Sequence, residues 1–356
     1  MKPRILLLTA FLTLTACKRE QKKSTSEPVL ISNHVQYTEE NEILNIQSGN
    51  FAYNFKKNQI PFKKIILLNA SMAGYITELG AENLIIGVAS PEYIYSEDIQ
   101  NLIKEGKIQN VGNEQKYDVE KIISLKPDAI FTNHITSFDN TYKLLKDHGI
   151  QVIFLDEYLE QNPLEKTAYI KLFGKLFGKS QEATDLYNEI NKNYQDLKKL
   201  AAKAKEKPTV LANEMYGNVW YLPGGKTSLA HFLSDANANY ILKNNAEQKA
   251  VTMSFEEVFA KAGQVQYWIN AGNHPSKKEM LTMNPVYSKL PVFNNGKIYV
   301  VTGKEKGKAN DFFESGVVRS DLVLKDYIKI FHPELLPDYQ FTYMKELQQL
   351  RLFAYF

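Results

Sequence analysis

The chain has 356 residues, which is more than one hydrophobic core usually holds, so its length predicts two domains. With 44% hydrophobic and 23% charged residues, its composition is that of a soluble globular protein. The formal net charge is only +3, and part of it belongs to the first 16 residues. A nearly neutral chain gives no reason to expect a nucleic-acid partner.

Residues 1–16 have the pattern of a signal peptide. Lys2 and Arg4 precede an apolar run over residues 5–14, which is too short to span a bilayer. The run ends in Leu14-Thr15-Ala16-Cys17, which resembles the lipobox of bacterial lipoproteins. By that resemblance the chain is cleaved before Cys17, which is lipidated and anchors the protein to a membrane. The alternative is a plain signal peptide followed by a chance cysteine. Cys17 is the only cysteine, so no disulfide framework is expected.

Residues 17–34 are largely polar and charged, which predicts a flexible tether behind the lipidated cysteine. Short apolar runs then alternate over residues 35–62, with a turn at Ser48-Gly49-Asn50. This pattern predicts an N-terminal β-hairpin against the first lobe.

Residues 63–162 alternate between short buried strands and helices, which predicts a doubly wound α/β lobe with a parallel sheet. Strands are expected at 65–68, 84–88, 128–131 and 152–155, and helices at 71–79, 99–105, 118–125 and 141–147.

Residues 163–206 form a helical connector, with helices at 163–177 and 180–205. In the second helix apolar residues recur every three or four positions from Ala183 to Ala204, Ser180 is placed as the N-cap, and Pro208 follows the end. Its expected length is roughly 39 Å. A helix of this length between two α/β halves predicts a rigid spine; the alternative is a surface helix of one large domain.

Residues 207–356 repeat the pattern of the first lobe and predict a second α/β lobe. Strands are expected at 209–212, 218–222, 267–270 and 298–301, and helices at 227–234, 254–261 and 320–331. The segments 118–133 and 254–271 echo each other, each with a capping residue, a Glu two positions later, a helix and a strand. This repeat supports two similar lobes.

Several motifs together resemble the substrate-binding lipoproteins of bacterial ABC importers for iron–siderophore complexes, haem and cobalamin. They are the lipobox at Cys17, SLKPDAIF at 124–131, VWYLPGG at 219–225, SFEEV at 254–258, NGKIYVV at 295–301 and the stretch 310–337. The last stretch most resembles iron-complex binders of the Bacteroidetes branch. The resemblance implies two Rossmann-like lobes joined by one long helix, the class III periplasmic binding protein fold. It also implies a monomer that serves an ABC importer permease dimer from the extracytoplasmic side of a membrane.

Ligands of open parallel sheets bind beyond the carboxyl ends of the strands. Applied to both lobes and combined with the family resemblance, this rule selects candidate ligand-binding residues: Ser71, Met72, Tyr93, Tyr95, His134, Tyr216, Trp220, His274, Phe312, Phe313 and Arg319. The aromatic members suit a large ligand with a flat or greasy periphery. The alternative for the tyrosines is that they cover the lobe, and for Trp220 that it packs beneath its hairpin.

His134 and His274 each follow a strand, one in each lobe, and are expected to form hydrogen bonds in the cleft. Two imidazoles without further ligands fall short of a metal cage, so no bound metal ion is expected. Lys304, Lys306, Lys308 and Arg319 offer positive charge to an anionic complex such as a ferric siderophore, or form a solvated loop.

The echoed segments place Glu120 and Glu256 where the family carries the glutamates that meet arginines of the transporter. The local alternative is that each carboxylate complements a helix dipole. Since Ser254 and Glu257 already have the spacing of a capping box, Glu256 is free to point outward.

An enzyme is not expected, since the chain carries no GxSxG, HExxH or GxxxxGK[ST] motif. The sequence therefore predicts a binding protein that captures a metal complex, with a ferric siderophore favoured and cobalamin or haem as alternatives. No covalent cofactor is expected apart from the lipid on Cys17.

Overall fold

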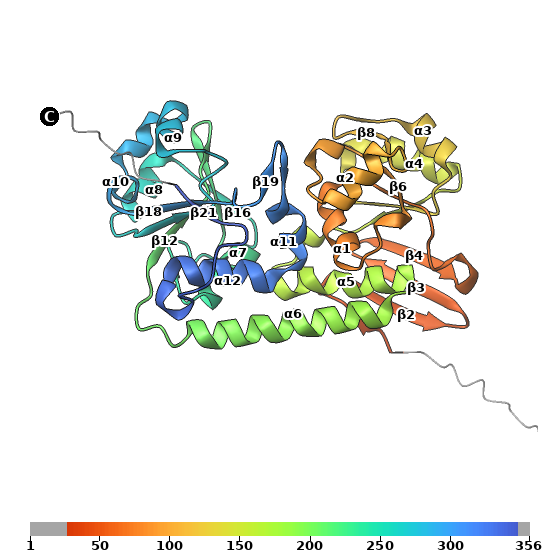
Figure 1. Cartoon of the computed structure of the whole chain (residues 1–356), viewed down its shortest axis with the longest axis horizontal. Helices are drawn as coiled ribbons and strands as arrows, with labels where there is room; N and C mark the ends of the chain where they lie inside the picture. The colour runs from red at the N-terminus through yellow and green to blue at the C-terminus, as the bar shows by residue number, and fades with distance from the viewer. Residues whose placement is uncertain (1–26, 348–356) are drawn as a thin grey trace, which may run out of the picture.

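The computed structural model describes residues 27–347, so the predicted signal peptide, Cys17 and most of the tether lie outside the described residues. Two α/β lobes stand side by side above a pair of antiparallel helices (Figure 1). Each lobe has a five-stranded sheet of its own. The two-lobe organisation predicted from the sequence is therefore present.

The N-terminal lobe contains a fully parallel sheet in the order β11-β10-β5-β6-β7. Its strands are β5 (Ile65–Leu67), β6 (Ile85–Val88), β7 (Gln109–Asn110), β10 (Ala129–Thr132) and β11 (Gln151–Phe154). The helices are α1 (Ala73–Glu78), α2 (Glu97–Lys104), α3 (Val119–Leu125) and α4 (Asp139–Asp147). Ile65 and Leu67 enter one core cluster and Ile66 the other, because successive strand side chains point to opposite faces of the sheet. Both faces are covered, which explains the unbroken apolar strands.

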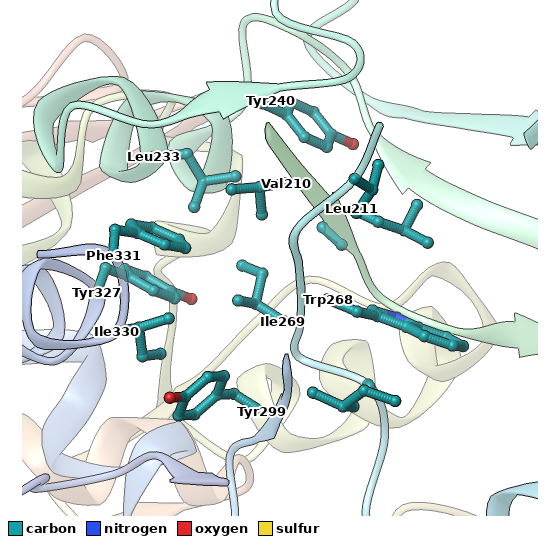
Figure 2. Close-up of a cluster of buried hydrophobic side chains, with 14 of the residues drawn as sticks. Val210, Leu211, Leu233, Tyr240, Trp268, Ile269, Tyr299, Tyr327, Ile330 and Phe331 are labelled. Carbon is teal, nitrogen blue, oxygen red and sulfur yellow. The ribbon is translucent and has the colours of Figure 1, made fainter. Parts of the chain in front are cut away.

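The C-terminal lobe has the sheet order β15-β12-β17-β18-β21, in which only the edge strand β21 is antiparallel. Its strands are β12 (Thr209–Ala212), β15 (Asn239–Tyr240), β17 (Tyr267–Ile269), β18 (Lys297–Val300) and β21 (Lys345–Glu346). The helices are α7 (Ser228–Asp235), α8 (Phe255–Lys261), α9 (Lys277–Met283), α10 (Pro291–Asn295), α11 (Ser315–Val318) and α12 (Ser320–Phe331). Figure 2 shows Ile269 beside Phe331 and Tyr327 of α12, while Trp268 of the same strand points to the other side.

A smaller antiparallel sheet and two hairpins complete the lobes. The sheet contains β13 (Met215–Tyr216), β14 (Val219–Pro223) and β16 (Ala250–Met253). The hairpins are β8 (Gly112–Asn113) with β9 (Lys116–Tyr117), and β19 (Glu305–Lys306) with β20 (Ala309–Asn310). The sequence pattern does not predict β16 or either hairpin, since their strands are short and carry little apolar periodicity.

The connector consists of α5 (Pro163–Phe177) and α6 (Ser180–Ala201), joined by Gly178 in a left-handed conformation (φ +71°). The predicted spine helix begins at Ser180, as expected, but its N-cap assignment and its C-terminal end are wrong. Lys179 is the N-cap, Ser180 is already helical, and the helix ends four residues before Lys205. Beyond Ala201, the amides of Lys203 and Ala204 bond to carbonyls three residues earlier, which is the pattern of tight turns. The side-chain amide of Asn237 donates to the Ala204 carbonyl at 3.1 Å.

Helix α6 extends beneath both lobes (Figure 1), over about 33 Å. Ala183 and Ile190 of its first half are buried in the N-terminal core, whereas Tyr194 and Ala201 of its second half are buried in the C-terminal core. One helix thus contributes side chains to both cores, as the spine interpretation requires.

The N-terminal segment is a four-stranded antiparallel sheet, so the predicted hairpin over 35–62 is wrong in extent. Its strands are β1 (Val29–Leu30), β2 (Val35–Glu40), β3 (Ile43–Ser48) and β4 (Phe51–Lys56), and β1 lies within the predicted tether. The Tyr53 hydroxyl accepts a bond from the amide of Phe154 at 2.8 Å, and the Ser48 hydroxyl donates to the Phe154 carbonyl at 2.9 Å. The extra sheet thereby satisfies polar groups of β11, the edge strand of the lobe.

Glu160 joins this extra sheet to the lobe through a buried carboxylate. It accepts bonds from the hydroxyls of Ser32 at 2.5 Å and Tyr169 at 2.8 Å, and lies 3.1 Å from Nδ1 of His34. The Ser32 oxygen also accepts from the amides of His34 and Val35. Ser32 is therefore central to this junction.

We expect Ser32→Ala to lower the free energy of unfolding by about 1–3 kcal/mol, because it leaves a buried carboxylate with one donor fewer. Urea unfolding followed by circular dichroism measures the change. Ser124→Ala is the matched control, since that exposed hydroxyl bonds only to the Lys121 carbonyl of its own helix. Equal midpoints for the two variants would show that the Ser32 hydroxyl does not stabilise the junction.

Candidate functional site

The carboxyl edges of the two parallel sheets face each other. Helix α1 follows β5 of the first lobe, and α11 follows β18 and the β19–β20 hairpin of the second. These two helices are in contact, and Gly74 of α1 lies against the backbone of Glu314, where a side chain would clash. Since all strands of a parallel sheet end at the same edge, the other strand-end loops of each lobe are expected on the same side of their sheet as these contacts.

Glu314 ties the C-terminal lobe to the N-terminal lobe. Its carboxylate accepts bonds from the backbone amides of Tyr95 at 2.6 Å and Ser96 at 3.1 Å. Burial raises the pKa of Glu314 to about 7, against the lowering effect of these bonds. Nearby, the Thr167 hydroxyl of α5 donates to the Val318 carbonyl at 2.7 Å. The lobes are therefore linked by direct hydrogen bonds as well as by α6.

The β19–β20 hairpin stands between the lobes (Figure 1), and two of its lysines, Lys306 and Lys308, contact the first lobe. Lys306 lies 2.6 Å from the Glu97 carboxylate and 4.7 Å from the ring centre of Tyr95. Lys308 lies 5.6 Å from the ring centre of Tyr93. Tyr93 and Tyr95, both selected from the sequence, thus contact the second lobe through these lysines.

The strand-end loops of the first lobe contain a polar network. Glu157 is buried and accepts from the Ser71 hydroxyl at 3.0 Å and from the Asn133 amide at 2.8 Å. Asn133 also pairs with Asn69. Burial raises the pKa of Glu157. Ser71 is therefore part of this network at the carboxyl end of β5. Met72 is fully buried, and its selection as a ligand-binding residue is wrong because its side chain belongs to the core.

Both selected histidines are paired with carboxylates of their own lobe. His134 lies 2.7 Å from Asp139, with its ring 4.9 Å from those of Phe51 and Phe154. His274 lies 2.6 Å from Glu214. Within residues 27–347 no cluster of three or more His, Cys, Asp or Glu side chains has the arrangement of a metal site.

The selection of Trp220 as a ligand-binding residue is wrong. Its side chain is completely buried, its ring nitrogen donates to the Ala212 carbonyl at 3.1 Å, and its ring lies 5.3 Å from that of Trp268. Since strand side chains alternate between faces and β16 pairs with β14, the inward face of β14 enters the core.

Tyr216, on the partner strand β13 of the same hairpin, is 83% exposed. Phe313 is 59% exposed, while Phe312 is half-buried, with its ring 6.0 Å from that of Tyr343. Tyr158, which follows β11, is 55% exposed and was not selected from the sequence. The only sequence signal for Tyr158 is its position just after a strand. These three exposed aromatic side chains come from strand-end loops of both lobes.

The guanidinium of Arg319 forms ion pairs with two acidic side chains. It forms two bonds of 3.0 Å to Asp321 and lies 3.8 Å from Glu78 of α1. Lys304 pairs with Asp311 at 3.1 Å. The cations predicted to attract an anionic ligand thus have carboxylate or aromatic partners within the protein.

Glu120 and Glu256 lie exposed in the first turns of α3 and α8. Asp118 caps α3 by accepting from the Lys121 amide at 3.0 Å, and Ser254 forms a capping box with Glu257. Other residues therefore provide the helix caps, which leaves both glutamates available to a partner. The exposed Phe259 lies on the same helix as Glu256.

In the part of the chain that the structure describes, no helix combines the length and apolar character needed to span a membrane.

The chain is similar to known proteins over most of its length. Residues 65–305 match the family described as periplasmic binding protein. An uncharacterized lipoprotein of Methanocaldococcus jannaschii is 24% identical, over 79% of this chain and 68% of the relative.

Two solved structures show the same fold. A possible iron-binding, periplasmic solute-binding protein of Staphylococcus epidermidis has a TM-score of 0.59 and 23% identity, over 77% of this chain and all of that one. The periplasmic haem-binding protein of Vibrio cholerae has a TM-score of 0.59 and 15% identity, over 76% of this chain and 99% of that one.

These matches confirm the class III fold predicted from the sequence, with its two lobes and single long helix. They also confirm that the chain is not an enzyme, because family members are substrate-binding proteins of ABC transporters. The protein belongs to the periplasmic binding protein family.

Proposed function

We propose that the protein captures a metal complex between its two lobes and delivers it to the permease of an ABC importer. The observation that carries this proposal is the meeting of two strand-end edges, from which Tyr158, Tyr216 and Phe313 remain exposed. Large exposed aromatic side chains around a boundary between domains are typical of a binding site. The iron-binding and haem-binding proteins of the same fold support a ligand of this class.

A ferric siderophore is the favoured ligand, and cobalamin and haem are the alternatives. The lipoprotein relative supports an anchor on Cys17, which would hold the protein at the extracytoplasmic face of a membrane. A monomer suits this role, because each copy has both lobes of the site.

The ligand class is tested by titrating the purified, detergent-solubilised protein with haem, cobalamin and a ferric siderophore. Intrinsic fluorescence reports binding, and visible absorbance and iron content report any complex that co-purifies. Saturable binding of one complex is expected. Saturation by none of them would remove the basis of the proposal.

We expect the double variant Glu120→Ala, Glu256→Ala to abolish uptake and leave ligand affinity unchanged. Affinity should be unchanged because both carboxylates lie exposed on helices outside the strand-end loops and have no capping role. Uptake should be lost because the family resemblance places these two glutamates where the transporter's arginines bind. Uptake of a labelled metal complex into proteoliposomes containing the importer, together with a binding titration, measures both quantities. Glu189→Ala, an exposed glutamate on α6, is the matched control. A loss of affinity in the double variant would show that these residues do not serve docking.

A further inference from the structure

The positive charges near the lobe boundary are engaged by the protein itself. Lys306 pairs with Glu97, Lys304 pairs with Asp311, and Lys308 faces the ring of Tyr93. Beneath the boundary, Arg319 is bound by Asp321 and Glu78. In addition, Lys277 is buried and donates to the Phe293 carbonyl at 3.0 Å. An anionic ligand would compete with an existing ion pair at Lys304, Lys306 and Arg319. Within residues 27–347, the exposed Lys308 has only its contact with the Tyr93 ring.

Three carboxylates lie on strand-end loops of the two lobes. Glu214 follows β12, Asp156 follows β11, and Glu305 begins the hairpin after β18. Their contacts are with neutral donors or a histidine: Asp156 accepts from the amide of His134 at 2.8 Å, and Glu305 accepts from Asn273. These loops therefore carry carboxylates that no lysine or arginine contacts among the described residues.

Glu214 is held in a defined position. Its carboxylate lies 2.6 Å from Nε2 of His274 and packs against Gly272, where any side chain would collide with it. Gly272 has a positive φ of +75°, a conformation that favours glycine. The Glu214 side chain nevertheless remains 30% exposed, so it can act on a ligand at the boundary.

We infer that the bound metal complex is neutral or cationic, with an aromatic or apolar periphery, and that Glu214 and Asp156 select against anionic complexes. This inference rests on the proposed function and narrows its ligand class. Like charges at close range disfavour an anion, whereas a cation gains from both the carboxylates and the exposed rings of Tyr158, Tyr216 and Phe313. From the sequence alone, the lysines could either attract an anionic complex or form a solvated loop, because their partners are not apparent there.

The test compares three ferric complexes of different charge on the full chain in detergent. They are a trishydroxamate with a protonated amine arm, which is a monocation, a neutral cyclic trishydroxamate, and a tris-catecholate trianion. We expect the monocation or the neutral complex to bind at least about ten-fold more tightly than the trianion at low ionic strength. Added salt should weaken binding of the monocation and leave the neutral complex unaffected.

Variants identify the source of the selection. Glu214→Gln and Asp156→Asn should each weaken the monocation roughly five-fold and leave the neutral complex unchanged, which is the effect of one charge at intermediate dielectric. Glu189→Gln on α6 makes the same chemical change far from the boundary and should alter neither. An equal effect of Glu214→Gln on both complexes would indicate a structural role and overturn the assignment.

The possible results distinguish a failure of the inferred charge selection from a failure of the proposed function. Tighter binding of the trianion would overturn the charge selection while supporting a metal-complex binder. Saturable binding of none of the three, nor of haem or cobalamin, would overturn the proposed function and this inference with it.

Discussion

Replacing Trp220 by alanine is expected to lower the free energy of unfolding by about 3–5 kcal/mol. The indole is completely buried against Trp268 and Tyr287, and its ring nitrogen bonds to the Ala212 carbonyl. The substitution therefore creates a large cavity between β14 and the main sheet. Chemical denaturation measures the change, and the variant should still bind ligand under conditions in which it remains folded.

Tyr216→Ala is the counterpart on the same hairpin. Because Tyr216 is 83% exposed, its removal should change the free energy of unfolding by less than about 0.5 kcal/mol and lower ligand affinity instead. If Trp220→Ala lost affinity without losing stability, the buried position of the indole would be incompatible with the result.

The stability of the protein is expected to fall between pH 4.5 and pH 7 through Glu314. Its pKa is raised from 4.5 to about 7 in the folded protein, mainly by burial. A raised carboxyl pKa means that the folded state holds the proton more tightly, so this stabilisation is complete below pH 4.5 and is lost as the pH rises through 7. The difference corresponds to about 3 kcal/mol.

Glu314→Gln removes this titrating group and should flatten that part of the pH profile. Asp311, the acidic neighbour of Glu314, and the amides of Tyr95 and Ser96 stay in place in the variant. Urea unfolding over a pH series compares it with the parent protein and with Glu189→Gln. The same slope in all three proteins would mean that other carboxyl groups account for the pH dependence.

Local signals predicted much of the fold. Asp118 and Ser254 are the caps of α3 and α8, as expected, and α5, α12 and β12 have the predicted bounds. Capping and apolar periodicity depend on residues a few positions apart, so the sequence displays them directly.

The site was harder to predict because its contacts join distant parts of the chain. Lys306 and Glu97 are 209 positions apart, and Glu314 bonds to backbone amides more than 200 positions earlier. No local pattern shows that a lysine is already paired. Similarly, the alternation in β14 does not reveal which face is covered, because β16, which lies beside it, has little apolar periodicity.

The placement of α6 also bears on how the protein unfolds. Ile190 lies in one core and Tyr194, one turn later, lies in the other. Unfolding of either lobe therefore exposes to solvent side chains of α6 that were buried in that lobe. The two lobes are thereby thermodynamically coupled, although each has its own sheet. A lobe expressed alone would expose half of that helix to water, so the cooperative unit of folding is the pair of lobes together.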